Sequence, residues 1–158
     1  MVKGISINVA GEFHAAHRLP GYSGPCGRLH GHTWEVIVSI TPQSAFSELE
    51  DACPAGDLIM LDFGDIKEIW AELDHSYLND TFENPTAEAI AWYIVECAVE
   101  LMLAEGPEVP FVVEVILSET KHNTIRVSEF HDPGLYLTND EPDWDQALKA
   151  AAAKSDQA

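Results

Sequence analysis

Positively charged residues are scarce in this chain. Its 158 residues include only 8 lysines and arginines against 27 aspartates and glutamates, which gives a formal net charge of -19 at pH 7. A chain of this charge repels the phosphates of nucleic acids and the headgroups of anionic membranes. We therefore expect it to bind neither nucleic acid nor a membrane.

Cysteines and long apolar runs are scarce as well. The three cysteines, Cys26, Cys53 and Cys97, are odd in number and widely spaced, which disfavours a disulfide framework and favours a reducing compartment. No segment approaches the ~20 apolar residues of a membrane-spanning helix, and the N-terminus lacks the basic and apolar regions of a signal peptide. We expect a cytoplasmic protein, most simply one domain with a substantial core.

Histidine and cysteine gather in one part of the sequence. His17 lies in the segment FHAAHRLP, and Cys26, His30 and His32 lie in the segment CGRLHGH that follows. Residues two apart on a strand project from the same face. His30 and His32 can therefore bind one ion together.

The alternation of apolar residues predicts two strands around these motifs. Apolar side chains alternate with polar or small ones over residues 5–9, and again over 34–40 with the parity of the HxH pair. The segment 21–26, with its glycines and proline, predicts a loop between them. An antiparallel pairing of the two strands would bring His17 opposite the HxH pair.

Three imidazoles with no obvious fourth protein ligand are typical of a catalytic zinc site, which keeps one position open for water or substrate. The spacing is also compatible with a closed structural site in which Cys26 is the fourth ligand. An HxH pair alone would be weak evidence for a metal, but His17 and Cys26 strengthen it. His14 should point to the opposite face of its strand from His17, and we interpret it as a bystander.

A helix is predicted to follow the apolar run that ends at Asp62. The apolar residues that come next have helical spacing, and Asp62 or Asp65 can cap the start of the helix. Asp74 and His75 stand together where this helix should end. Taken alone, they indicate no more than the usual preference of a helix C-terminus for a cationic imidazole.

A second helix is predicted from Asn84 to about Glu105. Asn84 can cap its start, Pro85 can take its first position, and Gly106 can end it. One apolar face of this helix should lie on the sheet. That face comprises Ile90, Ile94, Cys97 and Leu101.

Two more strands are predicted, from Phe111 to Leu117 and from Thr124 to Phe130. The order of elements is then strand, strand, helix, helix, strand, strand. This order predicts an α+β domain with an antiparallel four-stranded sheet covered on one face by two helices (ββααββ). Glu119 follows the third predicted strand, where a solvated acid would be unremarkable.

Five motifs, in this order, resemble the family of 6-pyruvoyl-tetrahydropterin synthases and 6-carboxytetrahydropterin synthases. The motifs are FHAAHRLP, CGRLHGH, LIMLDFGDIKEIWAELDHSYLN, NPTAEAIA and the terminal glutamate of VILSET. Together they cover roughly residues 5–127. Within the family, the short interval between Cys26 and His30 resembles that of the bacterial 6-carboxytetrahydropterin synthases of queuosine biosynthesis, whereas the animal biopterin enzymes have a longer one.

The resemblance implies the tunnelling fold over residues 1–130. In that fold such sheets join edge to edge into a barrel, which would also cover the open strand edges of a lone sheet. A homohexamer of two stacked trimers, with active sites between subunits, is the implied assembly. Residues 131–158 form a C-terminal extension outside the resemblance, and we assign it no role.

The resemblance also implies a role for each candidate site residue. The ligands of Zn²⁺ would be His17, His30 and His32. In this family the cysteine, here Cys26, is a base that works with a proton relay of an acid and an imidazole, here Asp74 and His75. Glu119 would anchor the pterin ring through its amino-pyrimidine nitrogens, since a carboxylate accepts two parallel hydrogen bonds.

The activity implied is that of a zinc-dependent lyase. It would convert 7,8-dihydroneopterin triphosphate to 6-carboxy-5,6,7,8-tetrahydropterin, with release of acetaldehyde and triphosphate, in queuosine biosynthesis. The alternatives are a 6-pyruvoyl-tetrahydropterin synthase activity on the same substrate, or a non-catalytic module that binds zinc or a pterin. An anionic substrate needs local cations in so acidic a chain. The candidates are Arg18, Arg28, Lys121 and Arg126.

Overall fold

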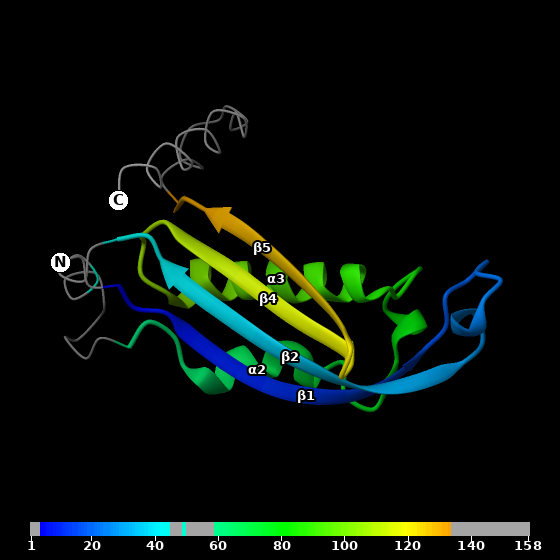
Figure 1. Ribbon diagram of the computed structural model, residues 1–158. Helices are drawn as coiled ribbons and strands as arrows, with labels where there is room; N and C mark the ends of the chain where they lie inside the picture. The colour runs from blue at the N-terminus through cyan, green and yellow to red at the C-terminus, as the bar shows by residue number, and fades with distance from the viewer. Residues whose placement is uncertain (1–3, 45–48, 50–58, 134–158) are drawn as a thin grey trace, which may run out of the picture.

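The computed structural model describes residues 4–44, 49 and 59–133. Most of these residues form one twisted sheet and two helices (Figure 1). The strands are β1 (Ile7–His17), β2 (His30–Pro42), β3 (Ser76–Tyr77), β4 (Phe111–Thr120) and β5 (Asn123–His131). The helices are α2 (Phe63–Ala71) and α3 (Ala87–Glu105), with short 3-10 turns η1 (Pro25–Gly27) and η3 (Leu78–Asp80). Along the sheet the strands follow the order β3-β1-β2-β4-β5.

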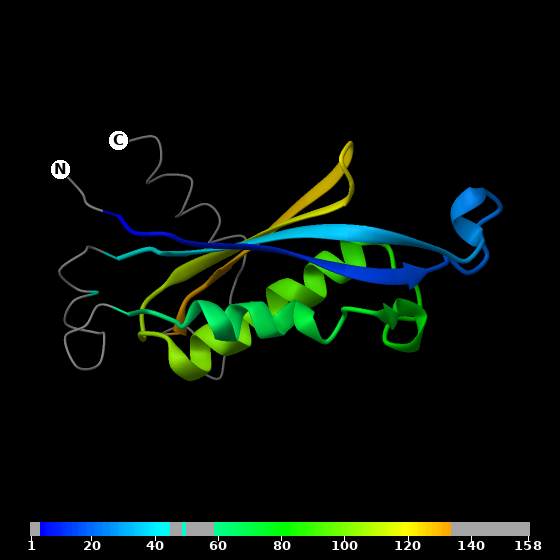
Figure 2. The same cartoon turned by 90° about the horizontal axis from the view of Figure 1, so that it is seen from below.

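The four long strands are antiparallel to their neighbours, as predicted. β1 and β2 are antiparallel along the whole of β1, from Ile7 opposite Ile40 to His17 opposite His30. β2 pairs antiparallel with β4, and β4 with β5. Figure 2 shows both helices on the same side of this sheet, so the expected α+β arrangement is confirmed at this level.

β3 corrects the prediction of a purely antiparallel four-stranded sheet. Its two residues pair in parallel with Ala15 and Ala16 near the end of β1, so the sheet is mixed and has five strands in the described part of the chain. The backbone N–H of His75, just before β3, donates to the carbonyl of His14 at 2.6 Å. A two-residue strand is too short to show an alternating pattern in the sequence.

Helix α2 begins where the sequence predicts. Asp62 is its N-cap, and one carboxylate oxygen accepts a hydrogen bond from the backbone N–H of Gly64 at 2.6 Å. Ile66 and Trp70 are buried on the face of the helix that meets the sheet. The helical spacing of the apolar residues therefore indicated this packing face.

Helix α3 begins later than predicted. Thr86 is its N-cap, with the hydroxyl accepting from a backbone N–H of the first turn at 3.2 Å. Asn84 is therefore not the cap, and Pro85 precedes the helix. Thr86 keeps an extended backbone, with φ −74° and ψ 159°, so the helix cannot include Pro85. The predicted end is confirmed, because α3 stops at Glu105 and the next residue is its C-cap.

The buried face of α3 is broader than predicted. Its buried residues are Ile90, Ala91, Ile94, Val95, Ala98, Val99 and Met102. Cys97 and Leu101, which the prediction placed on this face, are only partly buried. Ile90 and Ile94 are buried as predicted, and the rest of the buried stripe consists of alanine, valine and methionine side chains.

The remaining sequence expectations concern covalent bonds, membranes and the chain end. In the described part of the chain Cys26 and Cys97 are free thiols, and Cys53 lies outside the described residues. Across the described ranges, no helix is both long enough and apolar enough to cross a membrane. The proposed extension from residue 131 lies mostly outside the described residues, so the domain boundary stays a prediction.

Gly11 of β1 faces the indole of Trp70 on α2. A Cβ added at Gly11 would lie 2.8 Å from a ring carbon of Trp70. We predict that Gly11→Ala lowers the free energy of unfolding by about 1–3 kcal/mol, the usual cost of overpacking a core. Without a clash, a Gly→Ala substitution usually raises the free energy of unfolding, because it restricts the unfolded chain. A decrease would therefore report the contact with Trp70. Urea unfolding at a fixed protein concentration measures the difference.

Gly4→Ala is the matched control, since no atom lies within 4 Å of a Cβ added there. If Gly11→Ala left the unfolding midpoint at or above that of Gly4→Ala, the contact between β1 and α2 would not be as described.

Candidate metal centre

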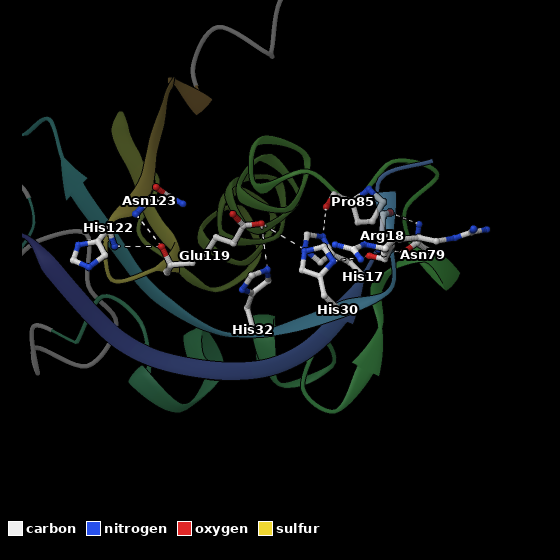
Figure 3. Close-up of polar contacts among 11 residues, drawn as sticks. His17, Arg18, His30, His32, Asn79, Pro85, Glu119, His122 and Asn123 are labelled. Carbon is white, nitrogen blue, oxygen red and sulfur yellow. Dashed lines mark hydrogen bonds and ion pairs between the residues drawn. The ribbon is translucent and has the colours of Figure 1, made fainter. Parts of the chain in front are cut away.

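Three imidazoles converge where β1 ends and β2 begins (Figure 3). His17 is opposite His30 in the strand register, and His32 lies two residues further along β2, on the same face. The ring centroid of His17 lies 4.5 Å from that of His30 and 5.2 Å from that of His32. The centroids of His30 and His32 are 4.9 Å apart. All three rings thus point into one space on the helix-covered face.

Glu119 of β4 contributes a fourth donor to this group. Its Oε1 lies 3.5 Å from Nε2 of His17 and 3.6 Å from Nε2 of His32. One donor atom from each of the four residues lies within 4.8 Å of all the others. The sequence predicts three histidine ligands with Cys26 as an alternative fourth, and the family resemblance implies only a substrate role for Glu119. Its parity with buried Leu117 was the available signal, because alternation puts both on the helix-covered face.

Hydrogen bonds to backbone carbonyls orient two of the imidazoles. Nδ1 of His17 lies 2.8 Å from the carbonyl oxygen of Pro85, and Nδ1 of His30 lies 2.7 Å from that of Arg28. A carbonyl can only accept, so in each ring Nδ1 carries the proton, and in the neutral ring Nε2 carries the lone pair. Metal-ligating histidines are held in this way.

The donor atoms are also buried. His17 is about 1% exposed, and Nε2 of His17 and of His32 has no hydrogen-bond partner among the described residues. Buried polar atoms without a partner cost free energy, and a bound cation removes that cost. Burial is the main cause that lowers the pKa of His32, against the opposing charge of Glu119. A neutral His32 is the form that ligates a metal.

These observations fit a divalent metal ion, of which zinc is one. Zinc takes three or four nitrogen and oxygen donors in a tetrahedral arrangement. Three imidazoles also accept other divalent ions. Trp34 packs against two of the imidazoles. Its ring centroid lies 5.2 Å from that of His17 and 5.4 Å from that of His32. Trp34 is fully buried.

A pocket of about 270 Å³ adjoins this cluster. Its lining includes His17 and Glu119 from the cluster, Cys26 from η1, and Thr86 and Glu88 from the start of α3. Cys26, which is predicted to be a base, therefore lines the same pocket as His17 and Glu119. A larger pocket, of about 610 Å³, lies at the far end of β1 beside residues 59–63, and neither histidine nor cysteine lines it.

Cys26 is held beside the cluster by its loop. Its carbonyl accepts from the backbone N–H of Leu19 at 2.8 Å, and its thiol is free and partly buried. The group of converging donor atoms in the described residues contains Glu119 and not Cys26. The structure therefore favours Glu119 over Cys26 as a fourth ligand.

Asp74 and His75 lie at the edge of β1 where β3 pairs, and neither belongs to the cluster. His75 Nδ1 is 2.8 Å from one carboxylate oxygen of Asp74, and the other oxygen accepts from the backbone N–H of His14 at 2.7 Å. His14 has the opposite parity to buried His17, as expected, and it is not among the converging donors, although its backbone N–H bonds to Asp74. Neither Asp74 nor His75 lines the pocket within this chain.

The backbone at His75 is unusual. Its φ is 56°, in the left-handed region that a residue other than glycine seldom adopts. The side chain is 82% exposed, and the centroid of its ring lies 5.8 Å from that of His14. Strained, exposed conformations persist only where the surroundings impose them. Here the two hydrogen bonds of Asp74 and the pairing of β3 with β1 do so.

The candidate cations show no shared binding site. Arg126 pairs with Glu114 at 3.6 Å. The backbone N–H and carbonyl of Arg18 are both bonded to the side-chain amide of Asn79, each at 2.9 Å (Figure 3). Within the described residues, none of the four candidate cations lines the pocket beside the cluster. Their role in holding an anionic substrate stays a prediction.

Comparison with known proteins identifies the family. The family model for 6-pyruvoyl tetrahydropterin synthase matches residues 6–129. The chain belongs to this family. The match spans both metal-site motifs, the two helices and β4.

Curated members of the 6-pyruvoyl tetrahydropterin synthase family are similar to this chain. A 6-carboxy-5,6,7,8-tetrahydropterin synthase of Synechocystis is 39% identical over 90 residues, 52% of this chain and 66% of that protein. The alignment thus spans just under two thirds of that relative. A protein of the same name from Bacillus subtilis is 31% identical over 124 residues, 72% of this chain and 78% of its own.

Solved structures of the family share the fold. The 6-pyruvoyl tetrahydropterin synthase of Caenorhabditis elegans has a TM-score of 0.57 at 19% identity, over 81% of this chain and 97% of its own. The enzyme of Plasmodium vivax gives 0.57 at 17% identity, over 82% and 99%. At these identities the likeness shows the fold alone.

The cluster predicts a specific effect of losing one imidazole. We expect His32→Ala to weaken zinc binding by at least about 100-fold, the upper end of what loss of a supporting group around a metal costs. Competition with a chromophoric chelator measures the affinity. His14→Ala is the matched control, because its ring lies on the opposite face of β1, and it should bind zinc like the unaltered chain. Equal affinities for His32→Ala and His14→Ala would contradict the cluster.

Asp74 predicts a second measurable property. The backbone N–H of His14, followed by the ring of His75, lowers the pKa of Asp74 below its ordinary value of 3.8. The stabilisation that its carboxylate gives is thus complete above pH 3.8 and is lost as the pH falls through the lowered pKa. In a carboxyl NMR titration, we expect His75→Ala to leave the pKa of Asp74 lowered, because the larger cause remains. A return to the ordinary value would show that His75 is the main cause.

Proposed function

We propose that this chain is a zinc-dependent 6-carboxytetrahydropterin synthase. It would convert 7,8-dihydroneopterin triphosphate to 6-carboxy-5,6,7,8-tetrahydropterin and release acetaldehyde and triphosphate, in queuosine biosynthesis. The observation that carries the proposal is one pocket lined by Cys26, by His17 of the metal cluster and by Glu119. The curated relatives that carry this name support the choice of reaction.

The metal cluster and the residues of the pocket would have separate roles. His17, His30 and His32 would hold zinc, which supplies Lewis acidity to the hydroxyls of the substrate side chain. Cys26, on the wall of the same pocket, would accept a proton from that side chain. Glu119 would accept two parallel hydrogen bonds from the amino-pyrimidine edge of the ring, which fixes the orientation of the substrate.

The proton relay requires more than one chain. Asp74 orients His75 through the 2.8 Å contact between carboxylate and ring. The side chain of His75 is 82% exposed, and neither member of this pair lines the pocket that Cys26 lines. We therefore propose that His75 acts in the pocket of a neighbouring subunit, within a homohexamer whose sheets join at their edges. An exposed side chain held in a fixed, strained position suits that role.

Product analysis tests the reaction. The zinc-loaded protein is incubated with 7,8-dihydroneopterin triphosphate, and the pterin product and any acetaldehyde are identified by mass spectrometry. Carboxypterin with acetaldehyde would support the proposal. Pyruvoylpterin without acetaldehyde would move the chain to the 6-pyruvoyl branch, and absence of turnover with zinc bound would favour a non-catalytic binding module.

Cys26→Ala should lower kcat by about 10²- to 10⁴-fold, the usual contribution of a positioned base, while zinc content stays at that of the unaltered chain. Cys97→Ala is the matched control, since this partly buried thiol of α3 does not line the pocket, and it should keep its activity. Loss of zinc from Cys26→Ala would instead support the closed site in which the thiol is a ligand.

Mixing two inactive variants tests the shared site. Cys26→Ala and His75→Ala each lack one part of the proposed proton transfer. If the thiol and the imidazole come from different subunits, hexamers assembled from both variants contain some sites with both groups. We predict that dissociation and reassembly of the mixture restores part of the activity, whereas each variant treated alone stays inactive. A mixture as inactive as its components would place both groups in one chain.

A further inference from the structure

The contact between Glu119 and two imidazoles is not a hydrogen bond. Distances of 3.5 Å to His17 Nε2 and 3.6 Å to His32 Nε2 exceed the usual 2.7–3.2 Å range for an N–H donor and an oxygen. In His17, moreover, Nδ1 donates to the carbonyl of Pro85 at 2.8 Å. In the neutral ring the lone pair on Nε2 then faces a carboxylate oxygen, and the two repel each other unless a cation lies between them.

The distances fit a shared metal ion. In a tetrahedral zinc site with bonds of about 2.0–2.2 Å, neighbouring ligand atoms lie about 3.3–3.6 Å apart. Oε1 of Glu119 has this spacing from two of the three histidines. The carboxylate is therefore placed where a fourth ligand of the metal belongs.

Glu119 also forms part of the wall of the adjoining pocket. In the proposed function it accepts two parallel hydrogen bonds from a pterin ring, and this uses both of its oxygens. A carboxylate oxygen has two lone-pair sites, so a hydrogen bond alone does not block ligation. Two parallel bonds nevertheless require both oxygens to face the ring, whereas ligation requires Oε1 to face His17 and His32. The two tasks of Glu119 therefore compete.

We propose that Glu119 is a reversible fourth ligand, which closes the metal centre while the pocket is empty and leaves the metal when a pterin ring enters. The metal would then gain its open position only with substrate in place. Ligation in the empty site follows from the geometry of this chain, whereas release by a pterin rests on the proposed function. By linkage, ring binding and the bond from Glu119 to the metal oppose each other.

Zinc affinity tests the first half. Glu119→Gln keeps the shape of the side chain and removes its charge. We expect it to weaken zinc binding by about 10- to 100-fold in chelator competition, without any ligand. Glu88→Gln is the matched control, because Glu88 lines the same pocket but is not among the four converging donors, and its zinc affinity should not change. Equal affinities for the two variants would overturn the proposal.

Cobalt spectroscopy tests the second half. Co²⁺ in place of zinc gives visible absorption bands that respond to a change of ligand. Neopterin has the pterin ring but no triphosphate, so it can bind but cannot undergo the elimination. Its fluorescence reports binding. We expect neopterin to shift the cobalt bands of the unaltered protein toward those of Glu119→Gln. In Glu88→Gln, the cobalt bands without neopterin should match those of the unaltered protein.

The other outcomes of these two experiments overturn either the ligation by Glu119 or its release. Neopterin that binds without any change in the cobalt bands overturns the release of Glu119, and so does a failure of neopterin to bind. The product assay judges the proposed function separately. A chain that turns over its substrate, but whose Glu119→Gln variant binds zinc as tightly as the unaltered chain, refutes the ligand and leaves the function standing.

Discussion

The register of β1 on β2 is the constraint on which the rest of the site depends. His17 reaches its partners because it is opposite His30, and a slip of one residue would turn one strand's histidines to the exposed face. Burial of apolar pairs on the same face fixes this register. Phe13 is opposite Trp34, and their stacked rings, with centroids 6.0 Å apart, are fully buried. Each such side chain contributes roughly 1.5–3 kcal/mol when buried, so the hydrophobic core holds the metal ligands in place.

A second constraint links the site to helix α3. Because the helix begins only after Thr86, the carbonyl of Pro85 lies outside the helix and is free to accept from His17. This one hydrogen bond decides which nitrogen of His17 faces the cluster. The same helix start supplies one wall of the pocket. The position of the helix cap thus determines which nitrogen of His17 carries the proton, and it also shapes the adjoining pocket.

Much of the fold and part of the site could be predicted from the sequence, because both depend on local periodicity. Alternation revealed the four long strands, and it also placed the three histidines on one face. Asn84 and Thr86 are both good caps, so nothing local decided between them. The contact of Glu119 with the histidines depends on how β4 aligns with β2. The bond from the backbone of His14 to Asp74 joins residues 60 positions apart, and no local pattern shows such a contact.

The proposed metal centre requires three imidazoles and one carboxylate on the metal ion of the empty site. X-ray absorption at the zinc edge of the zinc-loaded protein, without substrate, tests them most directly. Three imidazoles and a carboxylate predict only nitrogen and oxygen neighbours, at about 2.0–2.2 Å, with the outer-shell scattering of imidazole rings. A sulfur neighbour at about 2.3 Å would put Cys26 on the metal. That result would contradict the four proposed ligands, and the thiol could then no longer act as the free base of the pocket.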